Sequence, residues 1–355
     1  MDLSVVIPTY NEKENIQALL KEIFSVFKAN RIEGEVIIVD DNSPDSTGNI
    51  AEGLKKQYKN LKVVHRSGKL GLSSAVLEGW KISEGGILGV MDADLSHPPE
   101  KIPELYFPIK NQEADFTIGS RYIKGGKIVG WNFKRKLMSK TATLLARVYT
   151  KVKDPMTGFF MIKKECIENV ELNPKGFKIL LEVIIKGRYA KIKEVPITFT
   201  NRIEGKSKAG AGEIFYYLQN LLGYLKYKKN VMNEFFKFAF VGFIGTFINL
   251  AVLYMLTDMM GIYYVLSAIV SFMVAMTSNF ILNKTWTFKE KAKEKIANKY
   301  FTFFVVSITA LVFNLFFLYI FTEYLHIYYL ISQVLSIGIG LIINFMGNKI
   351  WTFSK

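Results

Sequence analysis

The stretch Ile87-Leu88-Gly89-Val90-Met91-Asp92-Ala93-Asp94-Leu95-Ser96-His97-Pro98-Pro99 decides how the first half of this chain folds. An apolar run with the length of a buried strand stops at Asp92, and the two prolines then turn the chain away. Asp92 and Asp94 offer the hard oxygen ligands that Mg²⁺ and Mn²⁺ prefer alongside substrate phosphates. The pattern alone also fits a surface turn, since two acidic residues at this spacing occur by chance.

The order of strand, polar turn and helix recurs before this stretch. Strands are expected at residues 3–8, 35–39, 61–64 and 87–91. Such alternation predicts right-handed βαβ units and a largely parallel sheet covered by helices. Ligands bind beyond the carboxyl ends of the strands in such sheets. Since Pro8 to Glu12, Asp40 to Asn42 and Asp92 to Asp94 all follow strands, their convergence on one edge favours an active site over a chance turn.

The chain becomes much more apolar from residue 235 onward. Of its 355 residues 50% are hydrophobic and 14% aromatic, which is too apolar for a protein that is soluble throughout. Four stretches approach the roughly 20 apolar residues that cross a bilayer, namely residues 238–256, 262–282, 301–321 and 327–345. We therefore expect a catalytic domain at residues 1–210 and an all-α transmembrane domain of four helices at residues 231–355. Residues 211–230 form an amphipathic linker expected to lie along the membrane interface or to pack on the first domain.

The apolar half contains an internal repeat. Asn279-Phe280, Asn283-Lys284 and Trp286-Thr287-Phe288 recur as Asn344-Phe345, Asn348-Lys349 and Trp351-Thr352-Phe353, and 344 − 279 = 65 residues. Each copy holds two spans, so the copies enter the membrane from the same side and are parallel repeats. Asn249 and Asn314, also related by this offset, mark either a polar path or hydrogen bonds between helices.

The charge distribution indicates partners and orientation. The formal net charge of +15 is compatible with nucleic acid, anionic lipid or phosphorylated substrates. The four spans favour a lipid bilayer and phosphate over nucleic acid. Lysines precede the first span and fill the connection between the second and third, whereas the other two connections carry no Lys or Arg. The positive-inside rule therefore predicts a multi-pass membrane protein whose catalytic domain and two termini are cytoplasmic. We expect no signal peptide at the start, and the single Cys166 excludes an internal disulfide.

Several motifs carry a resemblance to a known family. Four of them are Val6-Ile7-Pro8-Thr9-Tyr10-Asn11-Glu12, Asp40-Asp41-Asn42-Ser43-Pro44-Asp45, Asp92-Ala93-Asp94 and Gly119-Ser120-Arg121-Tyr122. Two later ones are Asp154-Pro155-Met156-Thr157-Gly158-Phe159-Phe160 and Arg202-x-x-Gly205-x-Ser207-Lys208. Together they resemble glycosyltransferase family 2, in the branch of the dolichyl-phosphate mannose synthases and other polyprenyl-phosphate sugar synthases. The repeated spans resemble the GtrA-like four-span domain. The resemblance implies a Rossmann-like α/β catalytic domain of the GT-A fold with a mostly parallel sheet.

The resemblance also implies roles for individual residues. The nucleotide sugar, GDP-mannose, would be bound by Pro8, Tyr10, Glu12, Asp40, Asn42, Asp92, Arg202 and Lys208. Asp92, Asp94 and Ser96 would hold Mg²⁺ or Mn²⁺. Ser96 departs from the family, which commonly has glutamine at this position as a further ligand, so its hydroxyl would coordinate weakly or through water. Asp92, Asp94 and Arg121 are the expected catalytic residues.

The acceptor is expected to be dolichyl (polyprenyl) phosphate. A lipid monophosphate with a second pKa of about 6 is largely a dianion at neutral pH and attacks without a general base. It needs cations that position it, and the planar fork of arginine suits phosphate. Arg121, Arg135 and Ser139 are the candidates. The expected reaction is a metal-dependent, inverting transfer that gives dolichyl β-D-mannosyl phosphate.

Other functions share parts of this pattern. A UDP-glucose-dependent polyprenyl-phosphate glucosyltransferase would use nearly the same residues, and Asp41-Asn42-Ser43-Pro44-Asp45 leans toward GDP-mannose only by resemblance. A flippase component for lipid-linked sugars with a regulatory transferase domain is the third alternative. A processive polysaccharide synthase is disfavoured, because the chain has no Gln-x-x-Arg-Trp motif and its spans all follow the catalytic domain.

Overall fold

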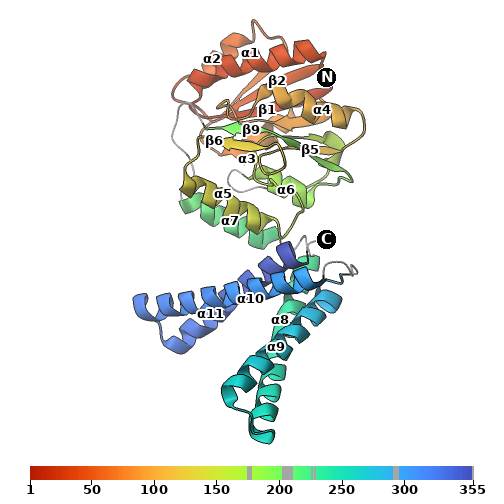
Figure 1. Ribbon diagram of the computed structural model, residues 1–355. Helices are drawn as coiled ribbons and strands as arrows, with labels where there is room; N and C mark the ends of the chain where they lie inside the picture. Colours follow the sequence, from red (N-terminus) through yellow and green to blue (C-terminus); the bar gives the residue numbers. More distant parts are fainter. Residues whose placement is uncertain (174–177, 202–210, 225–226, 228, 291–295, 354–355) are drawn as a thin grey trace. The chain divides into compact units, whose positions relative to one another are not determined.

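The chain folds into two compact units in a computed structural model, Met1–Tyr227 and Lys228–Lys355. The structure describes residues 1–173, 178–201, 211–224, 227, 229–290 and 296–353. The first unit is an α/β domain and the second is helical (Figure 1). The predicted fold class, a mostly parallel GT-A-type sheet followed by four apolar helices, is confirmed.

A seven-stranded sheet with the order β3-β2-β1-β4-β7-β5-β8 forms the centre of the first unit. The strands are β1 Leu3–Thr9, β2 Gly34–Asp40, β3 Leu61–His65, β4 Ile87–Val90, β5 Phe116–Ser120, β7 Phe160–Lys163 and β8 Ile192–Pro196. Every residue of β2 is buried, as expected for a parallel strand with helices on both faces. Only β7 is antiparallel, and it separates β4 from β5. A two-stranded sheet pairs β6 (Lys127–Val129) with β9 (Thr198–Thr200).

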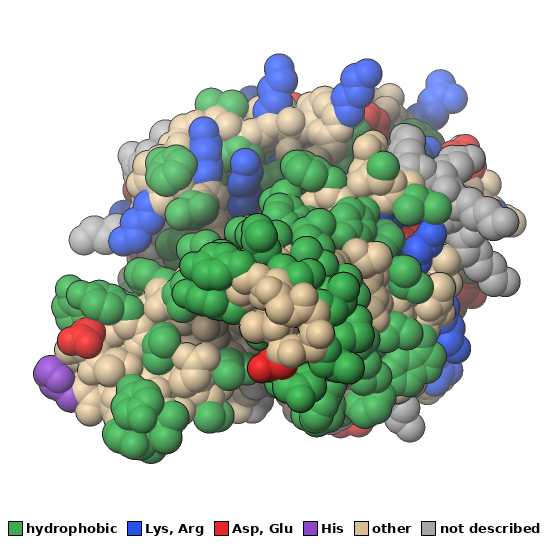
Figure 2. Space-filling model, turned by 60° about the horizontal axis from the view of Figure 1, so that its bottom comes forward, with side chains coloured by type: hydrophobic (Ala, Val, Ile, Leu, Met, Phe, Trp, Pro, Cys, Tyr) green, Lys and Arg blue, Asp and Glu red, His purple; other side chains and the backbone are tan. Residues whose placement is uncertain are grey.

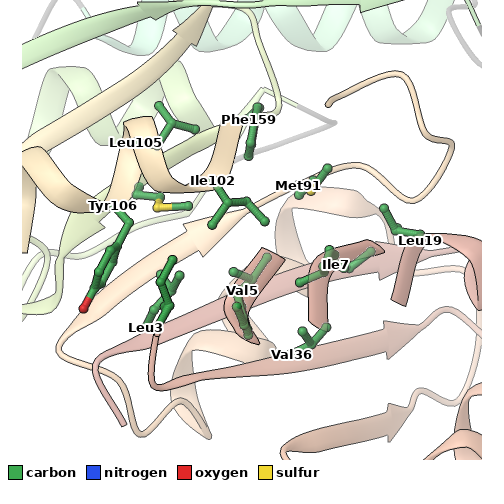
Figure 3. Packing of buried hydrophobic residues seen from close by; sticks show 14 of the residues in the cluster. Leu3, Val5, Ile7, Leu19, Val36, Met91, Ile102, Leu105, Tyr106 and Phe159 are labelled. Atoms are coloured by element: carbon green, nitrogen blue, oxygen red, sulfur yellow. The ribbon is translucent and has the colours of Figure 1, made fainter. Parts of the chain in front are cut away.

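Helices cover both faces of the sheet (Figure 1). They are α1 Lys13–Asn30, α2 Thr47–Leu54, α3 Leu72–Lys81, α4 Ile102–Lys110 and α6 Ile179–Lys186. Two further helices, α5 Phe133–Ala146 and α7 Ala211–Tyr224, lie side by side away from the sheet. Alternate residues of β1 divide the core: Val5 and Ile7 pack with Leu19 of α1 and Ile102 of α4, as Figure 3 shows, whereas Val6 belongs to the cluster of α3 and α6. This alternation is the period-2 geometry of a strand buried on both sides. It fixes the direction in which each strand leaves the sheet.

Asp115 joins three strands at the opposite edge from the predicted site. Its carboxylate accepts hydrogen bonds from Lys163 Nζ at 2.8 Å and from the backbone N–H groups of Ala190 and Lys191 at 2.9 Å. The hydrogen bond from Lys163, followed by those from the two N–H groups, lowers the pKa of Asp115 from 3.8 to about 2. The carboxylate therefore stabilises the fold fully above about pH 4, and its contribution is lost as the pH falls to about 2.

We expect Asp115→Asn to flatten the acid dependence of stability between about pH 4 and pH 2, because the amide does not titrate. The measurement is the thermal midpoint of the full chain in detergent as a function of pH. The parent protein should lose stability more steeply than the variant over this range. Parallel curves for the two proteins would contradict the role of Asp115.

Helix α7 packs against other helices of the first unit. Tyr217, Leu221 and Tyr224 are buried in a cluster with Ala146 and Met156. The Tyr217 hydroxyl donates to the carbonyl oxygen of Ala142 at 2.6 Å. Of the two positions expected for this amphipathic segment, the structure shows the packed one for these three side chains.

The second unit consists of two helical hairpins, α8 Lys229–Tyr254 with α9 Tyr264–Leu282 and α10 Ile296–Tyr319 with α11 Tyr329–Gly347. Their boundaries repeat the offset seen in the sequence, since 329 − 264 = 65. Each hairpin also has two π-helical segments at matching places, Met255–Met259 and Asn283–Thr287 in the first, Ile320–Tyr324 and Asn348–Thr352 in the second. The duplication predicted from the sequence is thus visible in the structure.

These helices are long and apolar enough to cross a membrane. The four candidate spans are Asn230–Met259, Tyr264–Thr287, Ile296–Tyr324 and Tyr329–Thr352, each longer than the apolar stretch in the sequence because the helices continue into flanking residues. At most 28% of each apolar window is buried within the chain. Figure 2 shows a face on which hydrophobic side chains predominate. Surfaces of this kind are soluble only in lipid, so the chain is a multi-pass membrane protein. Asn249 lines a cavity of about 320 Å³ within this unit.

Candidate active site

Three neighbouring strands bring their predicted site residues to one edge of the sheet. β1 lies between β2 and β4 and is parallel to both. Its carboxyl end carries Pro8, Tyr10 and Glu12. Asp40 ends β2 and Asn42 follows it, and Asp92, Asp94 and Ser96 follow β4. The structure therefore brings these eight residues to the edge where open α/β sheets bind ligands.

Hydrogen bonds tie the turns after β1 and β2 together. Asp40 is buried and accepts from the Thr9 hydroxyl at 3.0 Å and from the Ser43 N–H at 2.9 Å. The N–H of Glu12 donates to the Thr47 hydroxyl at 2.9 Å. Asp40 thus holds the turns after β1 and β2 together with both carboxylate oxygens. The sequence predicted Asp40 only as a nucleotide-binding residue and did not predict this structural role. Asn42 is exposed and has a φ of 55°, a left-handed conformation that asparagine tolerates better than most residues.

A third loop reaches this edge from β3, and the sequence prediction omitted it. Buried Arg66 forms an ion pair with buried Asp41, whose other oxygen accepts from the Gly71 N–H at 2.8 Å. Lys69, held between these anchors, places its Nζ 4.3 Å from the ring centroid of Tyr10. Lys69 follows the strand predicted at residues 61–64, as the other candidates follow their strands. This position could have identified Lys69 as a candidate.

The turn after β4 holds Asp92 and Asp94 in different surroundings. Asp94 is only 4% exposed and accepts from the Ser96 N–H at 3.1 Å, whereas the Asp92 side chain is 27% exposed. The Asp92 N–H donates to Nδ1 of His97 at 3.2 Å. His97, which the sequence prediction missed, is fully buried between the rings of Phe159 and Phe199, at centroid distances of 5.3 and 5.2 Å.

His97 is a neutral positioning residue. Burial lowers the pKa of His97 below its ordinary value, against the opposing charges of Asp92 and Asp94. Because Nδ1 accepts a hydrogen bond, the ring proton is on Nε2. His97 therefore orients the Asp92 backbone. In the sequence, only the position of His97 directly before the two prolines of the turn could have indicated this role.

The turn suits a divalent cation. Asp92 and Asp94 supply hard carboxylate oxygens, and the buried hydroxyl of Ser96 has no hydrogen-bond partner among the described residues. Within this part of the chain, no group of three His, Cys, Asp or Glu residues is arranged to hold a metal. The protein thus offers few ligands, which fits an ion such as Mg²⁺ that takes the rest of its ligands from substrate phosphates and water.

Gly158 leaves the space that Asp92 occupies. A Cβ atom at residue 158 would lie 2.7 Å from Asp92 Oδ1, closer than real contacts allow. We expect Gly158→Ala to displace this carboxylate and to lower kcat roughly 10- to 100-fold, since small misplacements at a reacting centre have effects of this size. Steady-state kinetics with matched thermal midpoints would measure it.

The control for this variant is Gly53→Ala on α2, because a Cβ atom there meets nothing within 4 Å. That variant should keep the parent kcat. Equal rates for Gly158→Ala and Gly53→Ala would show that the position of Asp92 does not matter for turnover.

The predicted acceptor residues form one cluster after β5 and on α5. The guanidinium carbons of Arg121 and Arg135 lie 5.4 and 4.2 Å from the ring centroid of Trp131. The Tyr122 hydroxyl donates to the Ser139 hydroxyl at 2.9 Å. The structure thus brings Arg121, Arg135 and Ser139 together through these two aromatic residues.

Arg121 is committed to a buried ion pair that the sequence prediction did not include. Its Nε and Nη2 donate to the two carboxylate oxygens of Asp154 at 2.7 and 2.8 Å, and its backbone N–H donates at 2.9 Å. Burial opposes the charge of Arg121, but the hydrogen bonds and charge of Asp154 raise its pKa overall, and Asp92 adds to this. The Arg121 guanidinium also lies 5.4 Å from the ring centroid of Phe199, the ring that contacts His97. The acidic turn and the acceptor cluster therefore adjoin each other, whereas Arg202 and Lys208 lie outside the described residues.

Comparison with known proteins identifies the family of both halves of the chain. Residues 4–170 match the model of glycosyl transferase family 2, and residues 237–353 match the GtrA/DPMS transmembrane domain. A dolichol-phosphate mannosyltransferase of Pyrococcus furiosus is 41% identical over 352 residues, covering 97% of this chain and 98% of the relative. One from Saccharomyces cerevisiae is 39% identical over 231 residues, covering 62% of this chain and 86% of the relative.

Among solved structures, glucosyl-3-phosphoglycerate synthase from Mycobacterium tuberculosis, in complex with Mn²⁺, UDP-glucose and phosphoglyceric acid, aligns with a TM-score of 0.47. The two proteins are 19% identical, and the match covers 64% of this chain and 79% of that chain.

Proposed function

This chain belongs to the dolichol-phosphate mannosyltransferase family within glycosyl transferase family 2, and from that membership we propose that it transfers mannose from GDP-mannose to dolichyl (polyprenyl) phosphate. The observation that supports this most strongly is the contact between two sites. The acidic turn after β4 and the arginine cluster share the ring of Phe199, through His97 and Arg121. A donor diphosphate and an acceptor phosphate need such adjoining sites.

The donor side is assigned to the turns after β1, β2 and β4. Pro8, Tyr10 and Glu12 with Asp40 and Asn42 would hold the nucleotide, because all five lie at one sheet edge. Asp92, Asp94 and Ser96 would hold Mg²⁺ or Mn²⁺, whose chemistry is to offset the negative charge that develops on the departing diphosphate. His97 keeps the Asp92 backbone in place through its Nδ1 atom.

The acceptor side is assigned to Arg121, Arg135 and Ser139. Asp154 fixes the guanidinium plane of Arg121, and Trp131 lies against both arginines. Two cations offset the repulsion between the acceptor dianion and the donor diphosphate. The acceptor oxygen attacks the anomeric carbon without a protein base, and direct displacement converts the α-linked donor into a β-linked product.

The substrates are tested by offering the purified full chain GDP-mannose or UDP-glucose together with dolichyl phosphate, with Mg²⁺, Mn²⁺ or EDTA. Mannosyl lipid from GDP-mannose with either ion, abolished by EDTA, is the expected result. Glucosyl lipid from UDP-glucose instead would assign the second donor. NMR of the product's anomeric centre would report inversion as a β linkage, and an α linkage would exclude direct displacement.

We propose a catalytic domain at residues 1–210, an amphipathic linker at 211–230 and a transmembrane domain at 231–355. The proposed orientation places the first unit and both termini in the cytoplasm. It rests on the lysine-rich connection between the two hairpins, in contrast to the connections within each hairpin. In a Cys166→Ser background, Met260→Cys should react with an impermeant maleimide in intact cells, whereas Lys289→Cys should react only after lysis. The reverse pattern would invert the proposed topology.

A further inference from the structure

A hollow of about 210 Å³ opens on the first unit beside α5, outside the residues assigned to donor and acceptor. It is lined by Tyr122, Lys140, Thr143, Leu144, Arg147 and Lys153. Three of the six carry a positive charge, and no acidic side chain lines the hollow. The nearest link to the acceptor cluster is Tyr122, whose hydroxyl donates to Ser139.

The basic side chains at this hollow form no ion pair. Within the described residues, no carboxylate oxygen lies within 4.0 Å of a side-chain nitrogen of Lys140, Arg147 or Lys153. The Glu194 carboxylate lies close by, but it accepts from the backbone N–H groups of Lys153 and Asp154 at 2.9 and 3.1 Å. Three like charges around one cavity repel each other, and a bound anion would relieve this repulsion. The hollow therefore has the charge of an anion site.

A buried hydroxyl in the hollow points to the same ligand class. Thr143 is only 7% exposed, and its Oγ1 atom has no hydrogen-bond partner within the part of the chain that the structure describes. A buried hydroxyl without a partner costs about 1–3 kcal/mol. An anionic oxygen in the hollow would accept its hydrogen bond, and phosphate offers several such oxygens.

The surface of α5 beside the hollow favours a lipid as the source of the phosphate. One face of α5 carries residues spaced by three and four, namely Phe133, Leu137, Lys140 and Leu144. Arg147, the C-cap residue, continues this spacing. Phe133 is 80% and Leu137 54% exposed, so this face begins with bare apolar side chains and continues into the basic hollow. Apolar side chains beside cations are typical of a helix that lies in a lipid interface.

We propose that the hollow binds the phosphate of an anionic glycerophospholipid, with Phe133 and Leu137 in contact with its apolar part. Lys140, Arg147 and Lys153 neutralise the phosphate, and the Thr143 hydroxyl donates to it. The site is separate from the proposed acceptor site, whose Arg121 and Arg135 do not line the hollow. A bound phospholipid would hold α5, which carries Arg135 and Ser139, at the membrane surface.

The test is binding of phosphatidylglycerol to the purified full chain in detergent, measured by native mass spectrometry, with phosphatidylcholine as reference. The triple variant Lys140→Gln, Arg147→Gln, Lys153→Gln should bind phosphatidylglycerol roughly 100-fold more weakly, about fivefold for each cation. The control removes the same charge from exposed lysines elsewhere, Lys21→Gln, Lys28→Gln, Lys56→Gln. It should bind like the parent protein, and phosphatidylcholine should not distinguish the three proteins.

Thr143→Val is the second variant, since it keeps the shape of the side chain and removes the hydroxyl. It should weaken phosphatidylglycerol binding several-fold without lowering the thermal midpoint. Equal phosphatidylglycerol affinity of the triple variant and its charge-matched control would overturn the proposal. Displacement of the phospholipid by inorganic phosphate would assign the hollow to a soluble ligand, and displacement by dolichyl phosphate would assign it to the acceptor. Either result would refute the phospholipid site and leave the proposed transfer reaction standing.

Discussion

Asp94→Asn is expected to reduce the turnover of mannosyl transfer roughly 10²- to 10³-fold, the size of effect seen when one group that stabilises developing charge is removed. Asparagine has nearly the same shape, and its carbonyl oxygen can still accept the hydrogen bond that the Ser96 N–H now donates to Asp94. The turn after β4 should therefore persist while one of its two carboxylate charges is lost. The measurement is transfer of labelled mannose to dolichyl phosphate at saturating substrate.

The matched control is Glu104→Gln, which removes one carboxylate from the exposed surface of α4. It should retain the parent rate, since exposed ion pairs contribute little. Binding of Mn²⁺ in the presence of GDP can be measured by EPR, because the signal of the free ion decreases as it binds. This binding should weaken in Asp94→Asn and remain unchanged in Glu104→Gln. Parent-like turnover of Asp94→Asn would remove the acidic turn from the mechanism.

The second large effect is expected at the buried pair of Arg121 and Asp154. Asp154 is fully buried and Arg121 is 7% exposed, so Asp154→Leu leaves a guanidinium without its counter-charge in the protein interior. Breaking a buried pair from one side costs about 3–5 kcal/mol of unfolding free energy. We expect Asp154→Leu to lose this stability and nearly all transfer activity. Thermal or denaturant unfolding can be followed by Trp80 and Trp131 after Trp286→Phe and Trp351→Phe remove the signals of the second unit.

The double variant Arg121→Leu, Asp154→Leu separates the two roles of this pair. Two apolar side chains that replace a buried ion pair often restore stability, so the double variant should be more stable than Asp154→Leu alone. Its activity should stay low, because the proposed acceptor cation is absent. Recovery of activity together with stability would show that Arg121 serves the fold and does not touch the acceptor.

The sequence predicted the part of the site that depends on local order. β1, β2 and β4 are short apolar runs that end in polar turns, and the rule that parallel strands share a carboxyl edge was enough to bring Asp40 and Asp92 to one place. The two helical hairpins of the membrane half were equally predictable, because the same motifs recur after 65 residues in the sequence. Both predictions needed only periodicity and strand direction.

Other features depend on contacts between distant segments. Arg121 and Asp154 are 33 residues apart, and they meet because antiparallel β7 lies between β4 and β5. No local pattern specifies that insertion. His97 likewise resembled an ordinary turn residue, and its role follows from rings contributed by Phe159 and Phe199. Contacts of this kind depend on the order of the strands in the folded sheet, and a single sequence does not reveal that order.

The paired organisation of the membrane helices has a consequence for how such a protein can evolve. A hairpin returns the polypeptide to the side from which it left, so gaining or losing one whole copy preserves the parity of crossings. Sequences before and after the copy keep their sidedness, and no loop has to exchange its charge. Duplication is therefore a topologically neutral event here, after which the two descendants are free to diverge residue by residue.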